Sequence, residues 1–117
     1  MIREKLVNEY RYLINDSYPY INSLLNNCYI KIIDGCLNPV SAPYYYLGIY
    51  YAGRNGKEIT LYKNELRQIA NSFGMIDIVF INAKRIIRDP ASTLKKENPR
   101  LWLELYWVSS KVSTNLD

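Results

Sequence analysis

The hydrophobic positions at the start of the chain recur with helical spacing and predict an amphipathic helix over residues 3–15. They are Leu6, Val7, Tyr10, Leu13 and Ile14. This i, i+3, i+4, i+7 pattern places them on one face of a helix. Pro19 fits the first turn of a second, short helix that ends at Asn26-Asn27. A third helix is predicted from Asn64, a residue suited to the N-cap, to Gly74, a residue suited to helix termination.

Three runs rich in β-branched and aromatic residues predict strands at residues 28–33, 44–51 and 58–62. The last two runs are separated by a segment that contains Asn55-Gly56, a pair that supplies the positive φ angles of a tight reversal. We therefore expect a β-hairpin over residues 44–62.

Side-chain alternation in the second strand of this hairpin predicts one buried and one partly solvated sheet face. Ile59 and Leu61 fall on the same face, whereas Glu58 and Thr60 fall on the other. Residues 36–43, which include two prolines, are expected to form a loop.

Two segments are compatible with either a helix or a strand. Residues 75–82 have strand composition, but the apolar spacing that follows favours a helix over residues 77–88 with Asp77 as its cap. Residues 100–108 alternate apolar and polar positions as a strand would. However, Asn98-Pro99 is typical of a helix start, so we expect a helix there.

Together these elements predict a single domain over residues 1–117 with an α+β fold, in which a small antiparallel sheet around the 44–62 hairpin is packed by four or five helices. With 117 residues and 49% hydrophobic composition, the chain can bury a core without metal or disulfide support. It contains no uncharged apolar run of about 18 residues and no secretory signal. We therefore expect a soluble, cytoplasmic protein without a membrane partner.

The absence of histidine argues against an enzyme. Among 117 residues there is no His, the commonest general base and metal ligand. A serine triad and a histidine-ligated zinc site are both excluded, and the carboxylates are too scattered for a paired acid and base. We expect no catalytic residues, no metal and no cofactor.

The two cysteines, Cys28 and Cys36, lack the paired spacing of a zinc site or a redox Cys-x-x-Cys motif. Two semi-buried thiols are one interpretation. A disulfide that clips a strand to the following loop is the other.

Tyrosine and basic residues indicate a contact surface instead. The chain has 12 tyrosines, 15 Lys and Arg residues and a formal net charge of +4. Tyrosine combines a large apolar ring with a polar tip, as contact surfaces require, and paired guanidinium groups can converge on anionic groups. The candidate binding surface consists of Tyr44, Tyr46, Tyr50, Arg54, Lys57, Lys84, Arg85, Arg88, Lys95, Lys96 and Arg100.

This surface predicts a non-catalytic binding protein that acts on a macromolecular partner. A protein partner is expected, or homo-oligomerisation through Trp102, Tyr106 or Trp107, because aromatic residues outside a core are typical of interfaces.

Nucleic-acid binding is the alternative prediction. A pI near 9.0 has the required sign, and the tyrosine-rich sheet face offers rings on which bases could stack. Residues 64–88 also fit a helix-turn-helix-like pair with Gly74 at the turn. The difficulty is that residues 76–79 of the reading helix present little hydrogen-bonding capacity to base edges.

The order of expected elements resembles the minimal zincin metallopeptidases of the minigluzincin type. The resemblance depends on residues 44–51, on residues 55–63 as a hairpin edge strand, and on residues 66–74 as the following helix. It implies a scaffold without the chemistry, because the positions of the HExxH metal motif are occupied by Asn82, Ala83 and Ile86. The composition is also similar to that of small proteins from viruses of hyperthermophilic archaea.

Overall fold

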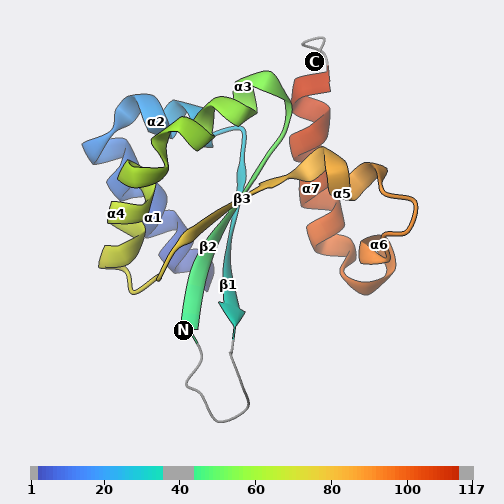
Figure 1. The fold of residues 1–117 in the computed structure, drawn as a ribbon, viewed down its shortest axis with the longest axis horizontal. Helices are drawn as coiled ribbons and strands as arrows, with labels where there is room; N and C mark the ends of the chain where they lie inside the picture. Colours follow the sequence, from blue (N-terminus) through green and yellow to red (C-terminus); the bar gives the residue numbers. More distant parts are fainter. Residues whose placement is uncertain (1–2, 36–43, 114–117) are drawn as a thin grey trace.

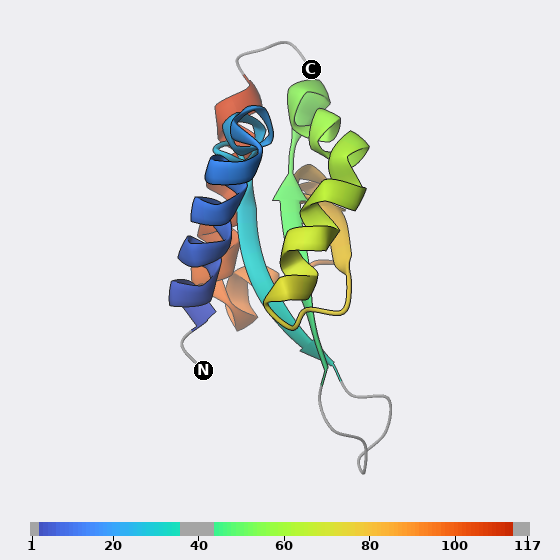
Figure 2. The same cartoon turned by 90° about the vertical axis from the view of Figure 1, so that its left-hand side faces the viewer.

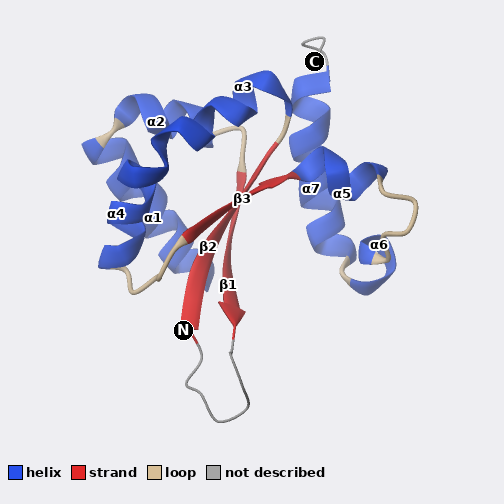
Figure 3. Cartoon of the chain, viewed as in Figure 1, coloured by secondary structure: helices blue, strands red, loops and turns tan. Residues whose placement is uncertain are grey.

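The computed structural model describes residues 3–35 and 44–113 and has an α+β fold (Figure 1). Helices predominate around three strands (Figure 3). The helices are α1 (Arg3–Ser17), α2 (Pro19–Leu25), α3 (Gly53–Lys57), the 3-10 helix η1 (Glu58–Tyr62), α4 (Lys63–Ser72), α5 (Ala83–Arg88), α6 (Leu94–Glu97) and α7 (Pro99–Ser113). The strands are β1 (Tyr29–Gly35), β2 (Tyr44–Tyr51) and β3 (Ile78–Asn82).

The three strands form a mixed sheet in the order β1-β2-β3. β1 and β2 are antiparallel, with Tyr29 opposite Tyr50 and Gly35 opposite Tyr44. β3 runs parallel to β2 on its other side. The hairpin of the molecule is therefore β1–β2. The prediction of an all-antiparallel sheet is wrong because β3 returns to β2 in parallel.

Helices cover both faces of the sheet (Figures 1 and 2). On one face, α1, α2 and α4 enclose the first core, which includes Ile14 from α1, Leu66 from α4 and the strand residues Leu47 and Ile49. On the other face, α5 and α7 enclose a smaller second core. Its buried members are Tyr50, Ala52, Ala83, Leu105 and Val108. The central strand β2 thus contributes side chains to both cores.

The predicted hairpin over residues 44–62 is wrong, because the chain leaves β2 as a helix. Gly53 adopts a φ of +76°, which glycine accepts readily, and residues 53–62 then form α3 and η1. A 3-10 helix repeats every three residues. Ile59 is therefore buried and Tyr62 packs against the same core, whereas Leu61 is 76% exposed.

The predicted helix over residues 77–88 is half correct. Residues Ile78–Asn82 pair with β2, and only Ala83–Arg88 is helical. The cap is Asn82, whose Oδ1 accepts a hydrogen bond from the Lys84 amide at 3.0 Å, and not Asp77. The helix-turn-helix-like pair over residues 64–88 is consequently wrong, since the strand β3 occupies the first part of its second helix.

The other helices are confirmed. Pro19 lies in the first turn of α2, and Gly74, with a φ of +87°, follows the end of α4. Asn98 caps α7, since its Oδ1 accepts a hydrogen bond from the Leu101 amide at 3.2 Å. This confirms a helix over residues 100–108. Asn64 is not a cap, because α4 begins one residue earlier at Lys63. In the part of the chain that the structure describes, no helix is long and apolar enough to cross a membrane.

Cys28 is enclosed in the first core. It is 2% exposed, and its thiol donates a hydrogen bond to the Leu24 carbonyl at 3.6 Å. Burial raises the pKa of this thiol from its ordinary 9.0 to about 11, although the charge of Arg11 opposes the shift. Cys36, which the alternative disulfide interpretation pairs with Cys28, and the predicted loop at 36–43 lie outside the described residues.

Alkaline pH is therefore expected to destabilise the protein. The folded state holds the Cys28 proton more tightly than the unfolded chain does. The stabilisation is complete below pH 9.0 and is lost as the pH rises toward 11, an effect on the order of 2 kcal/mol. Urea denaturation at a series of pH values measures it. A Cys28→Ser variant should lose less stability over this range, and equal losses in the two proteins would contradict the assignment.

Candidate binding surfaces

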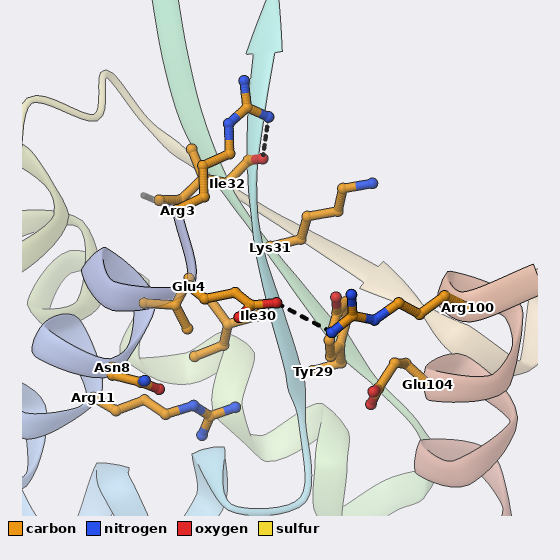
Figure 4. Close-up of a pocket in the computed structure, with 11 residues that line it drawn as sticks. Arg3, Glu4, Asn8, Arg11, Tyr29, Ile30, Lys31, Ile32, Arg100 and Glu104 are labelled. Carbon is orange, nitrogen blue, oxygen red and sulfur yellow. Dashed lines mark hydrogen bonds and ion pairs between the residues drawn. The ribbon is translucent and has the colours of Figure 1, made fainter. Parts of the chain in front are cut away.

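A groove lies along the outer edge of β1, between α1 and α7 (Figure 4). It encloses about 490 Å³. The strand forms its floor through residues 29–32, α1 forms one wall, and the first turns of α7 form the other. We call it the β1 groove. The lining residues are Arg3, Glu4, Val7, Asn8, Arg11, Tyr29, Ile30, Lys31, Ile32, Arg100 and Glu104.

Two arginines of α1 bind backbone carbonyl groups at the ends of this groove. Arg11 donates to the Cys28 carbonyl at 2.9 Å and to the Leu25 carbonyl at 3.0 Å. Arg3 donates to the Ile32 carbonyl at 3.4 Å and forms an ion pair with Asp34 at 3.3 Å. Burial lowers the pKa of Arg11, while nearby Cys28 and Tyr10 oppose the shift. Arg11 therefore has a structural role, whereas Arg3 remains half exposed.

The two walls of the groove are joined by one ion pair. Arg100 of α7 reaches across the edge of β1 and donates to Oε1 of Glu4 on α1 at 3.1 Å (Figure 4). The two side chains are 83% and 79% exposed. Exposed pairs of this kind contribute little to stability, so the bridge can open at small cost.

Four tyrosines follow the sheet face that α7 partly covers. The rings of Tyr44 and Tyr46 lie 6.4 Å apart, and those of Tyr29 and Tyr50 lie 5.9 Å apart. Burial raises the pKa of both Tyr29 and Tyr50. Tyr50 is only 6% exposed. It is therefore a core residue, and the predicted tyrosine surface reduces to the partly exposed Tyr44 and Tyr46.

A second surface lies on the outer side of α6 and α7. Trp102 and Tyr106 stack with ring centroids 5.3 Å apart, and the ammonium group of Lys95 lies 4.9 Å from the Trp102 centroid. Leu103 and Trp107, one turn apart on the adjacent side of α7, are 60% and 45% exposed. Residues three and four apart are neighbours on a helix. Lys95, Trp102, Leu103, Tyr106 and Trp107 therefore form one patch, which we call the α7 aromatic surface.

The remaining predicted site residues are dispersed. Tyr50 and Arg85 meet in a second hollow of about 590 Å³ between α5, α6 and α7. Arg88 ends α5, and Lys96 lies on α6. Lys84 lies in the first turn of α5, Lys57 lies on α3, and the side chain of Arg54 lies outside the described part of the structure. The proposed single basic and tyrosine-rich surface is thus divided among separate sites.

The sequence prediction missed the α1 side of the β1 groove. Arg3, Val7 and Arg11 are spaced by four residues on α1, which marks one helix face at the margin of the apolar stripe. That spacing was visible in the sequence. Its contact with β1 was not, because it joins residues far apart along the chain.

Among the described residues, no group of three or more Cys, Asp or Glu side chains lies close enough together to hold a metal ion. The geometry around β1 and α7 offers ion pairing, stacking and backbone hydrogen bonds.

No protein-family model, curated protein or solved structure matches the chain. The resemblance to the minimal zincins therefore stays a prediction. In the structure, residues 55–62 of the expected edge strand are helical. Asn82 ends β3, whereas Ala83 and Ile86 lie in α5.

Proposed function

We propose that this is a non-catalytic binding protein that contacts a protein partner through the α7 aromatic surface. The main observation in support of this proposal is that α7 has apolar side chains on two sides. Leu105 and Val108 are fully buried in the second core, while Leu103, Tyr106 and Trp107 remain between 45% and 60% exposed. The first pair belongs to the core that attaches the helix to the sheet, whereas the exposed residues lie outside that core.

The make-up of the α7 aromatic surface favours a protein as the partner. Trp and Tyr are enriched in protein interfaces and supply most of the binding energy there. The stacking of Trp102 on Tyr106 holds both rings in place before binding, which lowers the entropy lost on association. The one cation of this surface, Lys95, already lies over the Trp102 ring. Its positive charge is therefore less available to a phosphate backbone.

Photo-cross-linking from α7 tests the proposal. A photoreactive residue at position 103 is expected to give a discrete protein adduct in host extract, and Tyr106→Ser should reduce its yield about tenfold by removing an interface anchor. The matched control carries the same photoreactive residue at position 61, since Leu61 is an even more exposed leucine on η1. Tyr12→Ser, at an exposed tyrosine of α1, controls for the second change. Equal labelling from positions 103 and 61 would contradict the proposal.

Intrinsic fluorescence separates a protein from a nucleic acid. Both tryptophans of the chain belong to the α7 aromatic surface, so tryptophan emission, excited selectively over that of the tyrosines, reports on this one region. Titration with a single-stranded oligonucleotide is expected to leave the emission unchanged. Quenching that weakens steeply between about 50 and 200 mM salt would indicate nucleic-acid binding instead.

A further inference from the structure

The outer edge of β1 has backbone groups available for pairing. β1 is an outer strand of the sheet, and among the described residues its only strand partner is β2. In an antiparallel pair, backbone groups point alternately toward the partner strand and away from it. The carbonyl groups of Cys28 and Ile32 point outward, since they accept hydrogen bonds from Arg11 and Arg3. The N–H and C=O groups of Ile30 therefore also face the β1 groove.

We propose that an extended, acidic segment of a partner protein adds to this edge as a fourth strand. The segment would pair with the backbone of β1 near Ile30, between the two arginine contacts. Strand addition of this kind takes its affinity from main-chain hydrogen bonds and its specificity from alternate side chains. This surface is separate from the α7 aromatic surface, so the inference goes beyond the function proposed above and does not depend on it.

The charges around the groove select an acidic segment. Four cations line it, Arg3, Arg11, Lys31 and Arg100, against two carboxylates, Glu4 and Glu104. Arg11 is committed to backbone carbonyl groups. The other three can bind ligand carboxylates. Arg100 holds only an exposed ion pair, and Arg3 holds a half-exposed ion pair with Asp34 beside its long hydrogen bond of 3.4 Å to the Ile32 carbonyl. A second copy of this chain fits poorly, since antiparallel pairing of two β1 strands would bring the same cations together.

The two walls of the groove differ, and this sets the pattern of the segment. Side chains of an added strand point alternately to its two faces. One set would face α1, where Val7 and Asn8 lie, and the other would face Lys31 and Arg100 near α7 (Figure 4). Alternation of apolar and acidic residues satisfies both walls. The Glu4–Arg100 bridge, which spans the groove, would open and transfer Arg100 to a carboxylate of the segment.

Binding of a short capped peptide tests this proposal. The probe is an alternating Glu-Val peptide about eight residues long, a typical strand length. A second peptide of the same sequence carries N-methyl groups on alternate amides, which keeps its charge but removes its pairing edge. The first peptide is expected to bind at least about tenfold more tightly than the second, because main-chain hydrogen bonds supply the affinity. Binding should also slow hydrogen exchange at the Ile30 amide.

The charge requirement is tested by Arg100→Glu, which should weaken binding of the first peptide about tenfold by removing a cation from the groove. Lys63→Glu is the matched control, since Lys63 is an exposed cation on α4, and it should leave the affinity unchanged. Equal binding of the two peptides, unchanged exchange at Ile30, or equal effects of the two variants would each overturn the proposal. Cross-linking from position 103 is unaffected by any of these outcomes, so the two proposals can fail separately.

Discussion

Replacing Ile49 by alanine is expected to lower the free energy of unfolding by about 2–5 kcal/mol, which is the usual cost of emptying a fully buried site. Ile49 is 0% exposed. It lies in the central strand, opposite Ile30 of β1 and Phe80 of β3, so the cavity would be walled by paired strands that cannot easily collapse into it. Urea denaturation of the two proteins measures the difference.

Leu61→Ala is the control for this measurement. Leu61 is an apolar residue of the predicted hairpin that proved to be 76% exposed, and its removal should change the stability by less than about 0.5 kcal/mol. If Ile49→Ala and Leu61→Ala cost the same, the assignment of residues 44–51 as the central strand and of residues 58–62 as a surface helix would be wrong.

Replacing Arg11 by methionine is expected to destabilise the protein by about 3 kcal/mol, although Arg11 lies at the edge of the core. Methionine keeps most of the apolar stem but removes two hydrogen bonds from a charged donor, each worth about 1.5–3 kcal/mol. The Cys28 carbonyl would lose its arginine donor in a partly buried region, whereas the Leu25 carbonyl would keep the hydrogen bond from the Cys28 amide at 2.9 Å. The same denaturation experiment applies.

Two further variants separate this role from charge alone. Arg11→Lys keeps the charge but presents one nitrogen, which cannot span two carbonyl groups as a guanidinium does, so an intermediate loss is expected. Arg67→Met removes a surface arginine whose ion pair with Asp77 measures 4.0 Å, and its effect should stay below about 1 kcal/mol. A loss at Arg11 no larger than that at Arg67 would exclude the bridging role.

The sequence predicted the helices that carry their own signals. α1 has an uninterrupted apolar stripe, α2 has a proline in its first turn, and α7 follows Asn98-Pro99. Spacing and capping act within one or two turns. These elements could therefore be identified without knowledge of the rest of the fold.

The sheet could not be predicted in the same way, because its pairing is non-local. Residues 78–82 carry strand composition, yet whether they form a strand depends on β2, which lies far earlier in the chain. The pair Asn55-Gly56 led to the opposite error, because it predicted a hairpin strand at residues 58–62, which are helical. A turn signal reports only that the chain can reverse, and here both edges of β2 are already occupied by β1 and β3. No edge of β2 is left for residues 58–62.

The candidate sites also differ in whether local sequence signals or non-local contacts define them. The aromatic residues of α7 were expected at an interface because of their residue type, and the structure shows that Trp102 stacks on Tyr106. The β1 groove required knowledge that α1 and α7 lie on opposite faces of the sheet and meet across β1. Composition indicated Tyr, Lys and Arg as candidate contact residues, but it did not show which of them lie in the core. Tyr50 is the example, since it was predicted as surface and is buried.

The unequal size of the two cores determines which helices can open or shift most easily. Among the described residues, α5 and α7 attach to the sheet through few fully buried side chains, whereas α1, α2 and α4 share a much larger set. Regions with fewer buried apolar contacts open at lower free energy than the whole domain unfolds. Helix α7, which carries the exposed Trp107, therefore belongs to the layer of lower local stability. Its tilt can adjust to a partner while the strands and the helices on the opposite face keep their positions.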